Sequence, residues 1–136
     1  MKPKIVLIAA GLALAAVAPV LAHHSFAAEF DAHHAIRITG ALSRLEWTNP
    51  HSYFYLDVKD DEGKVTTWAC EGGGPLVLSR RGFRKSDLKL GDVLIIDGYQ
   101  AKDGSHLMDA RRVTLPDGRS LYGGAPGDGG PGDTGK

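Results

Sequence analysis

The chain of 136 residues is poor in cysteine and has no excess of charge of either sign. Its single cysteine, Cys70, excludes an internal disulfide, and we expect it to be a small buried hydrophobic residue. Sixteen basic residues balance sixteen acidic residues. The sequence therefore lacks the electrostatic signature of a protein that binds nucleic acid or anionic lipid, and no nucleic-acid partner is expected.

The longest hydrophobic run lies at the N-terminus. Two lysines within the first four residues precede Ile5–Ala18, which has no polar side chain, and Val20–Ala22 ends in a small residue. This order predicts a secretory signal peptide over residues 1–22 and a periplasmic or secreted protein. The run is shorter than the roughly 20 apolar residues that span a membrane, so no stable membrane anchor is expected after cleavage. The mature chain would begin at His23.

Glycine and proline dominate the other end of the chain. Residues 123–136 read "GGAPGDGGPGDTGK" and contain nothing to bury, which predicts a disordered, flexible tail. Residues 23–35 are interpreted as an N-terminal lead-in segment. The remaining residues, 36–122, suffice for a single small domain with one core.

Apolar residues alternate with polar ones through most of this domain, which predicts strands. A proline followed by a short apolar segment and Gly82 predicts one short helix. Gly40 in the first strand is followed by a change of phase at Leu45, which indicates a bulge and a bend. The expected strands are residues 36–47, 51–59, 64–70, 93–100 and 106–115, and the helix lies within residues 72–83.

Three strands, a short helix and two strands follow one another in the order of the OB-fold, a five-stranded, partly open barrel. We therefore predict an all-β fold, β-rich with one short helix and OB-fold-like. A small β-sandwich is the alternative, and the single helix and short chain disfavour it.

Several sequence motifs together resemble a family of small exported bacterial proteins of unknown function, domain of unknown function 6152. The similarity extends over the mature chain except its glycine-rich tail. It implies an exported, OB-like barrel and identifies no catalytic residue. The motifs are "HHSFAAEFD", "EWTNPHSYFYLDVKD", "RRGF", "GDVLIIDGYQAKDGS" and "ARRVTLPDGR".

Aromatic residues around the second strand form the first candidate binding site. Tyr53 and Tyr55 should point away from the core, on the strand where OB-folds commonly bind ligands. Trp47 and Glu71 are added as candidate ligand-binding residues, Glu71 because it precedes the glycine-rich "GGGP". A small ligand such as a sugar, or a periplasmic peptide or protein, fits a tyrosine platform. The plainer alternative is that the tyrosines pack against the N-terminal segment.

Six histidines provide the second candidate site. In an extended strand, the pairs at residues 23–24 and 33–34 would lie about 33 Å apart, so the two pairs do not suggest one shared metal site. A processed His23 offers an amine and an imidazole nitrogen, which suit copper(II) together with one more imidazole. His51 is the preferred third ligand and His106 the alternative. His24 is a poorer one because of its adjacent position.

The sequence thus favours an exported binding or accessory domain of unknown ligand, with no catalysis expected. No serine lies in a nucleophile-elbow context. The alternative function is a periplasmic copper-binding protein built on His23, with copper as its cofactor. Against copper stands the simpler interpretation that histidines near a chain end are solvent-exposed polar residues.

The copper hypothesis predicts that the mature protein with a free His23 amine gives a copper(II) paramagnetic resonance spectrum typical of nitrogen ligands. Blocking the terminal amine, or the substitution His51→Ala, should change that spectrum. Intact mass establishes the first residue of the mature chain. A spectrum that neither change alters would remove the hypothesis.

Overall fold

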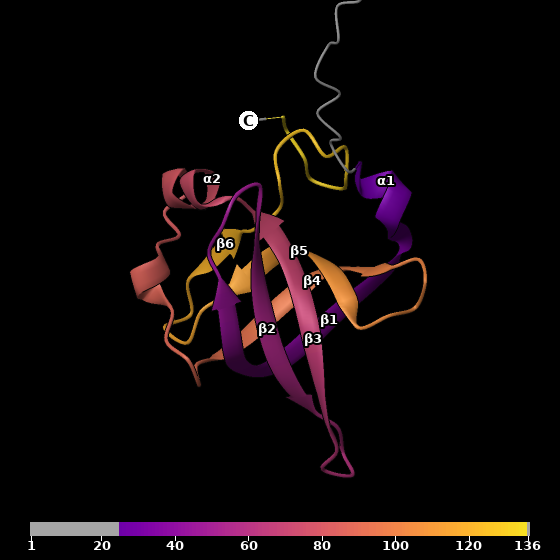
Figure 1. Ribbon diagram of the computed structural model, residues 1–136, viewed down its shortest axis with the longest axis vertical. Helices are drawn as coiled ribbons and strands as arrows, with labels where there is room; N and C mark the ends of the chain where they lie inside the picture. Colours follow the sequence, from indigo (N-terminus) through magenta and orange to yellow (C-terminus); the bar gives the residue numbers. More distant parts are fainter. Residues whose placement is uncertain (1–24, 136) are drawn as a thin grey trace, which may run out of the picture.

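The computed structural model describes residues 25–135 (Figure 1), and the predicted signal peptide lies outside them. Within this range no helix has the length and apolar character needed to cross a membrane. Most of the described chain forms strands. These are β1 (Phe30–Glu46), β2 (His51–Lys59), β3 (Val65–Gly73), β4 (Val93–Ala101), β5 (Leu107–Thr114) and β6 (Ser120–Tyr122), accompanied by α1 (Phe26–Glu29), α2 (Pro75–Arg80) and a 3-10 turn, η1 (Lys85–Asp87).

The strands form one sheet that closes into a ring. β1 pairs antiparallel with both β2 and β4, β2 pairs antiparallel with β3, and β4 pairs antiparallel with β5. A parallel pairing of β3 with β5 completes the ring. This arrangement confirms the β-rich, OB-fold-like class. The short β6 is a sixth strand that the sequence did not predict, and it extends the sheet beyond β5.

Alternation along the strands places the core inside this ring. Phe54 and Leu56 of β2 are fully buried, whereas Tyr53 and Tyr55, which alternate with them along the strand, lie on the outer face, as predicted. Cys70 of β3 is also fully buried among the core side chains, which confirms its role as a small hydrophobic residue. Burial raises the pKa of its thiol, so the group stays protonated and unreactive.

The long strand β1 is bent by a bulge, as predicted. Its register with β2 shifts between Leu42 and Arg44. At Gly40 the chain approaches β2 so closely that a Cβ atom would lie 2.6 Å from the carbonyl oxygen of Asp57. The bend lets one strand pair with β4 along its first half and with β2 along its second half.

The first strand begins earlier than the predicted strand over residues 36–47. β1 starts at Phe30, within the segment interpreted as a lead-in. The rings of Phe26 and Phe30 form a small second core with Ala101. Because both phenylalanines find a buried partner, this segment packs on the barrel instead of only leading into it.

The glycine-rich C-terminal segment has defined contacts, although its predicted flexibility itself stays a prediction. The carboxylate of Asp133 accepts backbone hydrogen bonds from Gly127, Gly129 and Gly135, which folds the segment into a compact turn. The backbone N–H of Phe26 donates to the carbonyl oxygen of Asp128 at 2.8 Å. In Figure 1 this yellow segment lies beside α1.

Gly98 of β4 is expected to tolerate no side chain. A Cβ atom there would overlap the carbonyl oxygen of Asp109 on β5, where the register of the two strands shifts. Gly98→Ala should lower the free energy of unfolding by about 3 kcal/mol or more, measured by urea denaturation. The control Val93→Ala, at an exposed position of the same strand, should change it by less than about 1 kcal/mol. Equal effects of the two substitutions would contradict this account of the β4–β5 contact.

Candidate functional site

The β2–β3 pairing brings three of the sequence-predicted residues together on the outer face of the barrel. Tyr53 lies opposite Glu71, and its hydroxyl donates a hydrogen bond to Oε2 of that carboxylate at 2.9 Å. His51 Nδ1 lies 3.2 Å from Glu71 Oε1. Burial and the charge of Glu71 raise the pKa of Tyr53, so the phenol stays a hydrogen-bond donor. One carboxylate therefore organises the histidine and the tyrosine.

Tyr55 extends this group, with its ring stacked at 6.2 Å from that of Tyr53. The guanidinium of Arg44 covers the ring of Tyr55 at 3.7 Å. This cation–π contact occupies part of the tyrosine platform that the sequence suggested for a ligand.

Two other predicted residues pack elsewhere. The ring of Trp47 lies edge-on against Phe83, with centroids 6.0 Å apart, and supports the core. His106 lies edge-on against Trp68 at 5.0 Å, so its contact differs from that of His51. Trp47 thus has a packing role, and His106 lies outside the group around Glu71.

A second polar group, which the sequence did not reveal, lies next to Glu71 across the β3–β5 pairing. Asp109 is the parallel partner of Glu71, and its Oδ1 lies 2.5 Å from Nε of Arg111. Both side chains are less than a tenth exposed. The Arg111 guanidinium also donates to the Tyr122 hydroxyl at 2.6 Å and to both carboxylate oxygens of Asp128 at 3.0 and 3.1 Å. Arg111 thus joins β5, β6 and the C-terminal segment.

The electrostatics of this group centre on Asp109. Burial raises its pKa to about 7; the Arg111 guanidinium opposes this rise, while Asp128 and Glu71 reinforce it. At neutral pH Asp109 therefore carries a proton part of the time. Asp128 then supplies most of the negative charge that balances Arg111.

The sequence pattern did not identify Asp109 and Arg111 as site residues, and the reason is physical. On β5, Met108 and Ala110 point inward, so alternation places Asp109 and Arg111 on the outer face, where charged residues are ordinarily exposed. Asp109 and Arg111 are nevertheless buried, because the two ends of the domain cover that face. No local sequence pattern reveals such a tertiary contact. One signal was present: consecutive arginines before Val113 break the alternation and indicate the bulge on β5.

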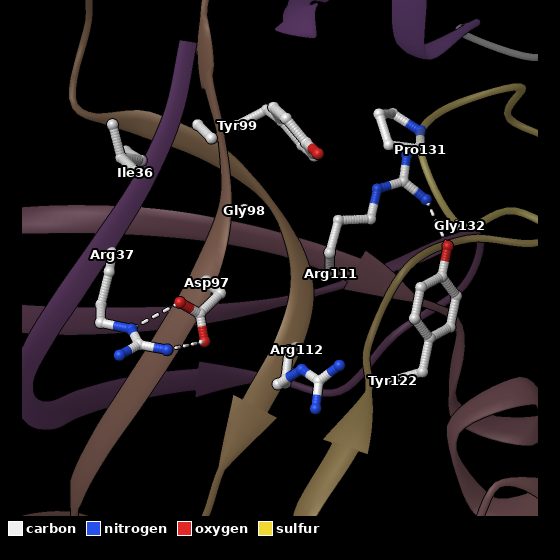
Figure 2. A pocket seen from close by; sticks show the side chains of 11 residues that line it. Ile36, Arg37, Asp97, Gly98, Tyr99, Arg111, Arg112, Tyr122, Pro131 and Gly132 are labelled. Atoms are coloured by element: carbon white, nitrogen blue, oxygen red, sulfur yellow. Dashed lines mark hydrogen bonds and ion pairs between the residues drawn. The ribbon is translucent and has the colours of Figure 1, made fainter. Parts of the chain in front are cut away.

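An open groove runs beside this group, over the outer face of β1, β4 and β5 (Figure 2). It has a volume of about 570 Å³. Tyr99 and Tyr122 stand on two sides of it, and Arg112 lies between Tyr122 and the ion pair of Arg37 with Asp97. Within residues 25–135 no carboxylate pairs with Arg112. The complete lining consists of Ala35, Ile36, Arg37, Asp97, Gly98, Tyr99, Arg111, Arg112, Tyr122, Pro131 and Gly132.

The described residues contain no group of three or more histidine, cysteine, aspartate or glutamate side chains arranged to hold a metal ion. His23 and His24, on which the copper hypothesis depends, lie outside the described range. The hypothesis therefore stays a prediction.

Comparison with known protein families supports the resemblance drawn from the motifs. The chain belongs to the Family of unknown function (DUF6152), whose sequence profile matches residues 10–108. No curated protein sequence matches the chain. Arg111 and its partners Tyr122 and Asp128 follow the matched region, whereas His51, Tyr53 and Glu71 lie within it.

The raised pKa of Asp109 predicts a pH dependence of stability. Between about pH 4 and pH 7 the folded protein holds a proton on Asp109 that the unfolded chain has released. The contribution of this group to the free energy of unfolding is therefore fully present below about pH 4 and is lost as the pH rises through 7. Asp109→Asn should flatten the dependence between pH 5 and pH 8, measured by urea unfolding at several pH values.

Asp117→Asn is the matched control. Hydrogen bonds from Arg119 lower the pKa of Asp117, so this exposed carboxylate stays charged throughout the same range. The control should keep the wild-type slope. An Asp109→Asn variant with that slope as well would show that Asp109 does not titrate in this range.

Proposed function

We propose that the protein is a binding or accessory module rather than an enzyme, and that its ligand lies in the groove over β1, β4 and β5. The observation that carries this proposal is the Arg112 guanidinium, which lies between Tyr122 and the ion pair of Arg37 with Asp97 in a groove of about 570 Å³. Sites for small molecules occupy about 300–1,000 Å³ and combine apolar walls with a few polar groups. Export to the periplasm or outside the cell, expected from residues 1–22, belongs to the same proposal.

The charges of the groove favour an anionic ligand. Arg37 is balanced by Asp97 through contacts of 2.6 and 3.2 Å, and Arg111 is balanced by Asp109 and Asp128. Arg112 has no such partner within the described residues, so its charge is left for a ligand. A planar guanidinium binds carboxylate or phosphate groups through two parallel hydrogen bonds.

The groove replaces the face of β2 as the favoured ligand site. On β2, Arg44 covers the ring of Tyr55, and Glu71 accepts the hydrogen bond of Tyr53 and lies 3.2 Å from His51 Nδ1. Ligand binding there would require these contacts to be exchanged. The groove over β4 needs no such rearrangement, because its tyrosine rings and Arg112 already border open space.

Copper binding is the second candidate function. The position of His51 is compatible with it: Nδ1 lies next to Glu71, which leaves Nε2 as the nitrogen that could bind a metal. Metal-binding histidines commonly have a carboxylate next to the other ring nitrogen. Copper titration of the mature chain, with its His23 amine free, tests this candidate separately from the groove.

Blocking the groove tests the main proposal. Titration with phenylacetate, an aromatic anion, should shift the backbone amide signals of residues 35–37, 97–99 and 111–112 in nuclear magnetic resonance spectra. Ala35→Trp places a large ring in the groove and should weaken this binding at least tenfold. Thr39→Trp, at an exposed position on the same strand outside the groove, should leave it unchanged. Signal changes elsewhere, or equal binding by both variants, would overturn the proposal.

A further inference from the structure

The contact of Arg111 with Asp128 has the features of a recognition site that is already occupied. Arg111 is almost completely buried, yet one of its nitrogens, Nη2, is turned toward the C-terminal segment and donates to both carboxylate oxygens of Asp128. The rings of Phe26 and Tyr122 flank the guanidinium at 4.9 and 5.9 Å. A buried cation between two aromatic rings, with donors held in place, is pre-organised for a carboxylate.

The barrel itself builds this site. Asp109 lies next to Nε of Arg111 as an ion pair, and the Tyr122 hydroxyl accepts a hydrogen bond from Nη1, so both contacts come from β5 and β6. Only the carboxylate bound to Nη2 comes from the glycine-rich segment. If Asp128 left, the guanidinium would keep its orientation and lose one anion.

The segment at residues 128–130, which occupies this site, also has a specific shape. The N–H of Gly130 donates to Oδ1 of Asp128 at 2.8 Å, so residues 128–130 form a tight turn around the carboxylate. Gly130 lies against Arg111 so closely that a Cβ atom would overlap Nη2 and would lie 2.7 Å from the ring of Phe26. The site therefore accepts an aspartate followed two positions later by glycine.

We infer that Arg111 is the centre of a binding site for an acidic peptide segment of the form Asp-x-Gly, which residues 128–130 of the protein itself occupy in the absence of a partner. The partner's carboxylate replaces that of Asp128, so the charge around Arg111 is conserved. This inference deepens the proposed function, because Arg111 and Tyr122 also line the groove, and a bound segment would continue into it.

The intramolecular segment competes with any partner. A carboxylate tethered by a short flexible chain has an effective concentration on the order of millimolar. Residues 123–127 tether Asp128 to β6, and backbone hydrogen bonds of Gly123 with Gly73 and Arg111 fix the start of this short tether. A partner therefore binds more tightly to a protein whose own carboxylate has been removed.

The experiment uses the full chain with Asp128→Asn and a capped peptide that copies residues 125–132, "APGDGGPG". The variant should bind the peptide at least tenfold more tightly than the wild type does, with a shift of the Arg111 side-chain N–H signal. Peptides with asparagine in place of the aspartate, or with alanine at the position of Gly130, should bind at least tenfold more weakly. The control Asp117→Asn should behave as the wild type.

The outcomes separate the inference from the proposed function. Equal binding by wild type and Asp128→Asn, binding that is insensitive to the two peptide changes, or no peptide binding would overturn the inference. If phenylacetate still shifts the groove signals in that case, the groove proposal stands alone. If the peptide binds as expected but phenylacetate does not bind, the inference about Arg111 is supported and the proposal of a small-molecule site in the groove is rejected.

Discussion

The parallel pairing of β3 with β5 is the contact on which the rest of the structure depends. It closes the ring of strands around the core, and its register places Glu71 beside Asp109. Glu71 organises His51 and Tyr53, whereas Asp109 orients Arg111. A single strand pairing therefore joins two polar groups from distant parts of the sequence and turns them toward the same outer face.

Much of the barrel could be predicted from the sequence because its determinants are local. The alternation in "HSYFYLDVK" gave the bounds of β2 and the inward direction of Phe54, and Gly40 with the following change of phase gave the bulge on β1. The additional strand β6 escaped prediction, because three residues are too few to show a period. Its pairing depends on the neighbouring strand β5 and not on its own sequence.

The candidate site was predictable only in part. Glu71, His51 and Tyr53 were singled out by residue type, and the pairing of β2 with β3 brought them together. Arg111 and Asp128 were not, because their contact joins a strand to a glycine-rich segment that contains no large apolar residue to signal packing. The periodicity of apolar residues in the sequence predicts which apolar side chains are buried. It does not predict which charged side chains are buried by a tertiary contact.

The convergence of the two ends of the described chain on Arg111 has a consequence for how the protein can be rearranged. Phe26 and Asp128 share a backbone hydrogen bond, so the ends of the domain lie side by side. Proteins with adjacent ends accept circular permutation, in which a short linker joins the old ends and new ones open at an exposed turn. The turn between β2 and β3, at residues 60–64, is exposed and projects from the barrel on the opposite side (Figure 1). Opening the chain there would leave both strands with their partners and would bring the residues that line the groove, and those that contact Arg111, onto one continuous stretch of chain.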